Sequence, residues 1–291
     1  MGHDHDHSGI GNLRFAFFLN LGFTIIEFIG GFFTNSVAIM SDALHDLGDS
    51  ISLGLAWYLQ NYSKKKRDDD FSYGYGRFSL LGAWINATIL IIGSLFIFYE
   101  AIPRLFNPQE VGVQGMFWFA IFGIAVNGYA AFRVSKGKSL NEQVISLHLL
   151  EDVLGWVGIL LGSVIMMFTD LPILDPILSI LIMLFVLYNA TKSMLKAMKV
   201  FLQGTPKNVD LEHVKELILA LPNVEDVYHP HVWSLDGEVN VLTIHIQLKN
   251  VNMTEAQEIK KRVRTLLKDL NIHHATIETE LVGDKMDTSD Y

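Results

Sequence analysis

Residues 79–101 read SLLGAWINATILIIGSLFIFYEA, an apolar stretch in which Glu100 is the one charged side chain. An α-helix needs about 20 mostly apolar residues to cross the hydrocarbon core of a bilayer. The same kind of stretch recurs at 12–33, 37–59, 113–133, 143–168 and 174–196. The sequence therefore predicts six membrane-spanning helices. A large soluble protein with buried helices is the alternative.

Basic residues gather on one side of this predicted helical array. They lie between the second and third stretches, around the end of the fourth, and at the end of the sixth, as Lys64, Lys65, Lys66, Arg67, Arg133, Lys136, Lys138, Lys192, Lys196 and Lys199. Lysine and arginine favour the cytoplasmic side of a membrane. We therefore expect a multi-pass protein of the cell membrane with both termini in the cytosol, and the one-sided charge disfavours the soluble alternative.

The composition divides the chain into three parts. Charged residues make up 18% of it, against about 25% in soluble proteins, and the shortage lies within 12–201. We predict a transmembrane domain at 12–201, a cytosolic domain at 202–291 and a His/Asp-rich tail at 1–11. There is no cysteine, which excludes thiolate metal sites, and the net charge of −9 argues against nucleic acid as a partner.

Two predicted spans carry the same pattern, His-x-x-x-Asp. His45 with Asp49 lies in the second span, and His148 with Asp152 lies in the fifth. Residues four apart share a helix face, and ionisable groups inside a membrane are costly and usually functional. Two imidazoles and two carboxylates are a ligand set that suits tetrahedral Zn²⁺. A helix-internal ion pair is the structural alternative for each pair taken alone.

Three nearby polar residues are expected to support this site. Asp42 and Glu151 would act as hydrogen-bond acceptors, proton carriers or packing partners. Asn86, in the third span, would support the site or form a hydrogen bond between helices.

Charge counting predicts how such a site would work. Two aspartates with two neutral histidines carry a charge of −2, which one divalent cation or two protons would neutralise. Because metal needs deprotonated ligands, metal and protons compete. We predict a transporter that exchanges metal for protons. An intramembrane metalloenzyme is the first alternative, but four protein ligands would leave no position for a substrate. A metal sensor or gated channel is the second.

The tail of the chain has the pattern helix, strand, strand, helix, strand. The predicted helices cover about 210–221 and 254–270, and the strands 224–234, 239–248 and 277–281. This is a small α+β domain. His231 and His245 lie on paired strands and His274 precedes the third strand, so the three could converge on a second metal site. The alternative is that these histidines simply lie on a solvated sheet face. At the N-terminus, His3, His5 and His7 could collect metal, and disordered sequence is the alternative there.

Several motifs taken together resemble the cation diffusion facilitator family, which includes bacterial zinc–cobalt–cadmium efflux proteins and animal zinc transporters. The residues that match the family's motifs are Asn35 to His45 with Asp49, Tyr73-Gly74-Tyr75-Gly76-Arg77, Asn86, His148 with Asp152, Asp175-Pro176-Ile177, His231 to Leu235, and His274 to Glu278.

This resemblance implies properties that spacing alone does not. It implies a homodimer that exports cytosolic Zn²⁺, with Cd²⁺ or Co²⁺ as further substrates, in exchange for protons. The two His/Asp pairs match the family's transport site. The tail would be a ferredoxin-like, metal-binding domain in which zinc is structural or regulatory, and its site would comprise His231, His245, His274 and Glu280. The protein would not be an enzyme.

Overall fold

The structure is a computed structural model that describes residues 6–63, 65–135 and 140–282, with the backbone alone at 6–16, 140–148 and a few further helix positions. The chain forms two compact units. One comprises Met1–Asn61 with Leu81–Met194, and the other comprises Tyr62–Leu80 with Leu195–Tyr291. The loop between the second and third helices therefore groups with the C-terminal part of the chain.

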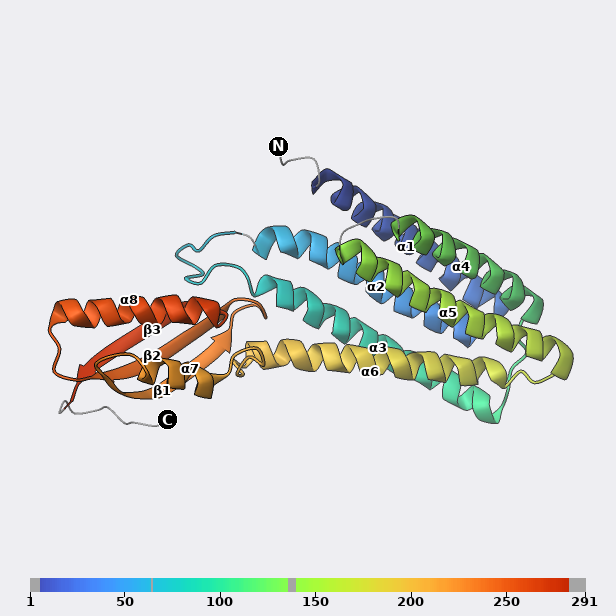
Figure 1. The fold of residues 1–291 in the computed structure, drawn as a ribbon. Helices are drawn as coiled ribbons and strands as arrows, with labels where there is room; N and C mark the ends of the chain where they lie inside the picture. Colours follow the sequence, from blue (N-terminus) through green and yellow to red (C-terminus); the bar gives the residue numbers. More distant parts are fainter. Residues whose placement is uncertain (1–5, 64, 136–139, 283–291) are drawn as a thin grey trace. The chain divides into compact units, whose positions relative to one another are not determined.

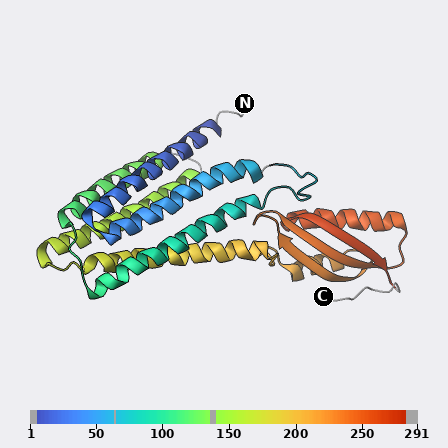
Figure 2. The same cartoon turned by 180° about the vertical axis from the view of Figure 1, so that it is seen from behind.

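Six long helices precede the C-terminal elements. They are α1 (Asp6–Thr34), α2 (Val37–Ser63), α3 (Phe78–Phe106), α4 (Val113–Val134), α5 (Leu140–Thr169) and α6 (Leu174–Phe201). Figures 1 and 2 show α1 beside α4 and α3 beside α6. Each predicted apolar stretch lies within one of these helices.

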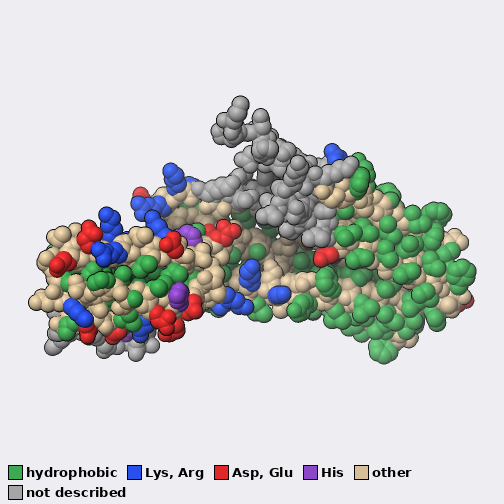
Figure 3. All heavy atoms as spheres, viewed as in Figure 1, with side chains coloured by type: hydrophobic (Ala, Val, Ile, Leu, Met, Phe, Trp, Pro, Cys, Tyr) green, Lys and Arg blue, Asp and Glu red, His purple; other side chains and the backbone are tan. Residues whose placement is uncertain are grey.

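Among the described residues, five of the six helices are long and apolar enough to cross a membrane. The exception is α2, whose hydropathy is lowered by Asp42, Asp46 and Asp49. Figure 3 shows hydrophobic side chains over most of the visible face of the helical unit and mixed charges on the other unit. The helical membrane domain is confirmed, whereas the sixth span stays a prediction.

α2 is central to the helical unit because it contributes to two hydrophobic cores. Ile39 packs with Phe23 of α1, Met116 of α4 and Trp156 of α5. Leu44, five residues further along α2, packs instead with residues of α3 and α6. Close van der Waals packing of side chains stabilises such contacts between membrane helices. A side chain on α2 can therefore reach the interface with α5 as well as the interface with α3 and α6.

The C-terminal unit is a three-stranded sheet with two helices. Its elements are α7 (Leu211–Leu219), β1 (Val224–Ser234), β2 (Asn240–Leu248), α8 (Met253–Asp269) and β3 (Ile272–Leu281). The strand order is β1-β2-β3, with β1 antiparallel and β3 parallel to β2. Both helices pack on the sheet face that presents Leu242, Ile244, Ile246 and Leu248. The small α+β domain is confirmed.

Local sequence signals explain where these elements begin. Asp210 caps α7 by accepting hydrogen bonds from the backbone N–H groups of Glu212 and His213. Asn252 and Glu255 form a capping box at the start of α8. Gly237 has a φ of +99° in the turn between β1 and β2, a conformation that favours glycine. β3 begins at Ile272, five residues before the predicted start at Ile277, because the parallel pairing with β2 already includes Ile272 opposite Asn240.

Candidate metal sites

The start of α2 is held by a buried carboxylate at the start of α6. Asp175 accepts hydrogen bonds from Ser36 Oγ at 2.5 Å, from Val37 N at 2.8 Å and from Ala38 N at 3.2 Å. The first backbone N–H groups of a helix have no partner within the helix, so a carboxylate there satisfies them and favours the helix dipole. This contact fixes the position of α2, and hence of the two candidate ligands on it.

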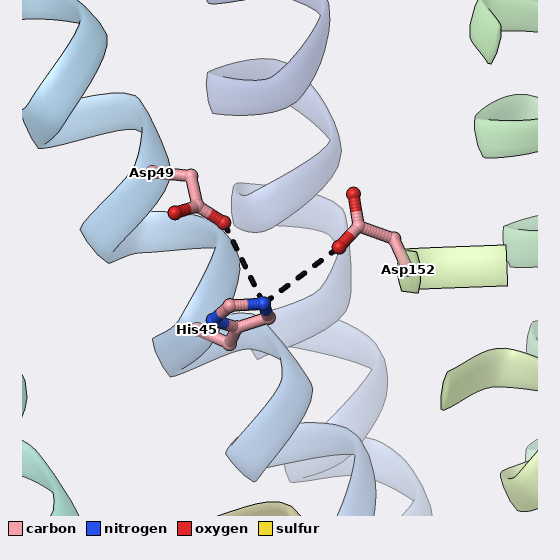
Figure 4. Close-up of side chains that lie close together, drawn as sticks. All are labelled: His45, Asp49 and Asp152. Atoms are coloured by element: carbon pink, nitrogen blue, oxygen red, sulfur yellow. Dashed lines mark ion pairs between the residues drawn. The ribbon is translucent and has the colours of Figure 1, made fainter. Parts of the chain in front are cut away.

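His45, Asp49 and Asp152 converge in the helical unit (Figure 4). His45 Nε2 lies 3.7 Å from Asp49 Oδ2, one turn further along α2, and 3.7 Å from Asp152 Oδ1 on α5. The three candidate ligand atoms all lie within 4.8 Å of one another. Ligand atoms about 2.0–2.2 Å from a tetrahedral zinc are about 3.3–3.6 Å apart. The observed triangle therefore needs little contraction to hold one ion.

The fourth predicted ligand is placed by its backbone alone. His148 lies in α5 one turn before Asp152, and its side chain is outside the described residues. The structure thus brings together three members of the two His-x-x-x-Asp pairs, and His148 stays a prediction.

A cavity of about 230 Å³ adjoins these ligands. It is lined by His45 and Asp49, by two of the predicted support residues, Asn86 and Glu151, and by residues of α6. Asn86 Nδ2 donates a hydrogen bond to Ser52 Oγ at 2.6 Å, while Asn86 Oδ1 is buried and has no partner among the described residues. The cavity therefore joins His45 and Asp49 to residues of α3 and α6, and polar side chains form part of its lining.

Two polar residues that line this cavity were not predicted. Asn189 and Ser193 lie four residues apart on α6 and so share one face of that helix. The signal for them is present in the sequence, because they are polar residues at helical spacing within a largely apolar stretch.

Further carboxylates are buried close to the candidate ligands. Glu27 and Asp46 are fully buried, and Asp42 is 3% exposed. Asp42 Oδ1 faces α5, where a Cβ atom added to Gly155 would lie 3.4 Å from it. Such a concentration of acidic groups disfavours a bound anion and favours a cation or protons. Asp42 thus lies where a support residue was predicted.

The sheet of the C-terminal unit carries a second cluster. His245 Nδ1 lies 3.0 Å from Glu280 Oε1, and His245 Nε2 lies 3.8 Å from Glu278 Oε2. These candidate ligand atoms lie within 4.8 Å of one another. Side chains alternate along a strand, so Glu278 and Glu280 share the β3 face that neighbours His245. Glu278 was not among the predicted ligands, although its spacing from Glu280 indicates the shared face.

Hydrogen bonds shift the pKa values of Glu280 and its neighbour Tyr228. The Tyr228 hydroxyl donates a hydrogen bond to Glu280 Oε2. That bond, with the one from His245, lowers the pKa of Glu280 below its ordinary value. Burial and the bond to Glu280 raise the pKa of Tyr228. Glu280 is therefore ionised and able to bind a cation at neutral pH.

Two predicted tail ligands lie outside this cluster. Tyr228 is the β1 partner of His245, and a bulge separates Tyr228 from His231. His231 is opposite Thr243, and His274 is opposite Val241. Within the described residues, the carboxylates of β3 therefore take the places beside His245 that two histidines were expected to fill.

The bulge brings a different histidine near the cluster. His229 has a φ of +47°, an uncommon conformation for a residue other than glycine. Its ring centroid lies 5.9 Å from that of His245. His229 is thus a candidate for a further ligand from β1.

Comparisons with known proteins identify both parts of the chain. Residues 13–202 match the model of the cation efflux transmembrane domain, and residues 206–282 match that of the cation efflux protein cytoplasmic domain. The chain is 35% identical to the cadmium, cobalt and zinc/H(+)-K(+) antiporter of Bacillus velezensis, over 99% of this chain and 95% of the relative.

Two further relatives have the same level of identity. Zinc transporter ZitB of Pectobacterium atrosepticum is 35% identical, over 96% of this chain and 89% of the relative. Metal cation efflux system protein CzcD of Cupriavidus metallidurans is also 35% identical, over 96% and 90% of the two chains. This chain belongs to the cation diffusion facilitator family, whose members are membrane transporters for metal cation efflux and not enzymes.

Proposed function

We propose that this protein exports cytosolic Zn²⁺, with Cd²⁺ and Co²⁺ as further substrates, through a tetrahedral site made by His45, Asp49, His148 and Asp152. The observation that carries the proposal is the approach of His45 Nε2 to Asp152 Oδ1, at 3.7 Å, from two different helices. An imidazole and two carboxylates from α2 and α5 form most of a zinc ligand set. The relatives whose names include zinc support the choice of metal.

We propose protons as the counter-ions. Asp49 and Asp152 carry two negative charges next to further buried carboxylates, so an empty, deprotonated site is costly in a membrane. Protons binding to the same atoms would displace the metal and neutralise the site. The name of the Bacillus relative, an antiporter of metal with H(+) and K(+), supports this exchange.

The orientation and assembly belong to the same proposal. Basic residues after α2, around the end of α4 and near the end of α6 favour a cytosolic location for both termini in the cell membrane. The C-terminal unit matches the cytoplasmic domain of cation efflux proteins, and a homodimer held through this domain is the assembly that we expect.

The C-terminal cluster would be a second metal site of structural or regulatory type. Its donors, His245, Glu278 and Glu280, fit a divalent cation because one imidazole and two carboxylates lie within reach of one point. A metal bound there would draw β2 and β3 together and neutralise the paired carboxylates. Of the predicted tail ligands, this proposal uses His245 and Glu280, and it adds Glu278 and His229 as candidates.

Zinc flux into proteoliposomes under an imposed pH gradient tests the transport proposal. We expect zinc to accumulate when the gradient drives proton exit and to stop when a protonophore collapses it. Zinc flux that is independent of the gradient would overturn the exchange, and absence of flux for zinc, cadmium and cobalt would overturn the substrate class.

A further inference from the structure

A second cavity lies in the C-terminal unit, apart from both metal clusters. Its volume is about 550 Å³, and it lies between the α2–α3 loop (residues 65–77) and residues of the β1–β2 hairpin. Trp233, Leu235, Asp236 and Val239 line the hairpin side. Binding sites for small ligands have volumes of about 300–1,000 Å³. This cavity is therefore large enough for a phosphorylated headgroup or a small soluble phosphate compound.

The loop that forms one wall has a defined internal structure. Lys65 Nζ lies 3.0 Å from Asp68 Oδ2, and the Tyr75 hydroxyl donates to the same carboxylate at 2.7 Å. The bond from Tyr75 and the one from Lys65 lower the pKa of Asp68 to about 2. Gly74 has a φ of +79°, which allows the chain to turn back on itself. The wall is thus preorganised, which lowers the entropic cost of binding a ligand.

The charge of the lining favours an anion. Four basic side chains, Lys65, Lys66, Arg67 and Arg77, line the cavity together with two acidic ones, Asp70 and Asp236. Asp236 Oδ1 already accepts hydrogen bonds from the backbone N–H groups of Glu238 and Val239. This net positive lining occurs in a chain whose net charge is −9.

Arg77 gives the strongest sign of a ligand. Its Nε is buried and has no hydrogen-bond partner among the described residues. A buried donor of a charged group is costly without an acceptor. Guanidinium groups bind phosphate through paired hydrogen bonds, so a phosphate oxygen in the cavity would satisfy this donor.

The position of Arg77 indicates where such a phosphate would come from. The apolar helix α3 begins at Phe78, directly after Arg77, and it is one of the helices long enough to cross a membrane. Residues at the cytoplasmic end of a membrane helix lie at the level of lipid headgroups. We propose that this cavity binds a phosphate group through Arg77, Lys66 and Arg67. An anionic phospholipid headgroup and a soluble phosphate are the two sources of that chemistry.

Binding to the purified full-length protein in detergent tests the proposal. The probes are short-chain phosphatidylglycerol, short-chain phosphatidylcholine and inorganic phosphate, measured by native mass spectrometry and calorimetry. We expect Arg77→Gln to weaken phosphatidylglycerol binding at least about tenfold, and Arg77→Lys to weaken it less. The matched control is Arg264→Gln, an exposed arginine on α8, which should leave binding unchanged.

Competition separates the two sources. Inorganic phosphate that displaces phosphatidylglycerol supports a general phosphate site, whereas phosphatidylglycerol binding without competition supports a lipid site. Should Arg77→Gln fail to fold, the exposed pair Lys66→Gln with Arg67→Gln replaces it, again with at least about tenfold weaker binding expected. Equal binding by the cavity variants and Arg264→Gln, or no binding of either anionic probe to wild type, would overturn the proposal.

Discussion

His45 and Asp152 approach each other from α2 and α5, with Nε2 of the first 3.7 Å from Oδ1 of the second. The two residues are far apart in sequence, so the fold must hold two helices in register for the pair to form. Asp152 is almost fully buried, whereas the His45 side chain is 21% exposed. This difference in exposure supports the proposed transport site, in which the histidine faces the adjoining cavity and the carboxylate is buried behind it.

The packing that holds α5 against α4 should affect transport without touching a ligand. A Cβ atom on Gly123 of α4 would lie 2.3 Å from the ring of Trp156, which is fully buried one turn after Asp152. We expect Gly123→Ala to destabilise the protein by about 1–3 kcal/mol because overpacking moves α5, and to lower zinc flux. Thermal unfolding in detergent and liposome flux measure the two effects.

Gly128→Ala provides the control on the same helix. A Cβ atom at Gly128 would meet nothing within 4 Å, so this variant should behave as wild type. Equal stability and flux for both alanine variants would show that contact between Trp156 and the glycine face of α4 does not position Asp152.

The carboxylate at the start of α6 should be needed for stability. Asp175→Asn replaces one of the two oxygens that accept from Ser36, Val37 and Ala38 with a donor. We expect a loss of about 2–3 kcal/mol, since buried hydrogen bonds to charged groups are strong and an unpaired donor costs as much. Denaturation of the purified protein measures it. A change below about 0.5 kcal/mol, the range for surface substitutions, would rule out the capping role.

The C-terminal cluster should bind a metal independently of the transmembrane site. Glu280→Gln removes a negatively charged donor beside His245 and should weaken zinc binding at that site by at least about tenfold. Calorimetry on the full-length protein measures the zinc bound per chain. Glu225→Gln is the control, because Glu225 is an exposed residue of β1 paired with Lys249. If both variants bind as much zinc as wild type, Glu280 is not a ligand.

The α2–α3 loop should contribute stability with a defined pH dependence. The pKa of Asp68 is about 2 in the folded protein, against an ordinary value of 3.8. The pKa of Asp68 is lower in the folded protein than in the unfolded chain. Its contribution to stability is therefore fully present above a pH of 3.8 and is lost as the pH falls toward 2. The stability difference between wild type and Asp68→Asn should thus be constant near neutral pH and shrink below about pH 4.

Thermal unfolding across this range checks the prediction. The neighbouring, exposed Asp69 supplies the control variant Asp69→Asn, which should track wild type. A stability difference for Asp68→Asn that grows on acidification would reverse the sign and contradict the loop network.

The sequence predicts the membrane helices well because the length and apolar character that a span requires are both visible in the sequence itself. α3 extends from Phe78 to Phe106 and continues past Pro103. Because proline disfavours the interior of a helix, local propensity alone would end the helix near Pro103. α2 is the hard case. Its aspartates lower the same hydropathy that identifies a span, so the residues proposed to bind metal also make the helix harder to recognise.

The grouping of His45, Asp49 and Asp152 was predictable from the sequence, whereas the grouping around His245 was only partly so. His45 and Asp49 share a face through helical spacing, which the sequence displays directly. The neighbours of His245 depend instead on strand register. The bulge between Tyr228 and His231 changes which β1 residue lies opposite His245. Pro230 is a sequence signal for an edge strand or a bulge, but it does not specify which residues pair on either side of it.

The most direct test of the transport site is zinc flux into proteoliposomes under an imposed pH gradient, comparing wild type, Asp152→Asn and Asp170→Asn. Asp170 is an exposed aspartate directly after α5, so its variant makes the same chemical change outside the site. We predict gradient-driven flux for wild type and Asp170→Asn, and flux at the level of protein-free liposomes for Asp152→Asn. Zinc transport by Asp152→Asn at the wild-type rate would contradict the proposed intramembrane site.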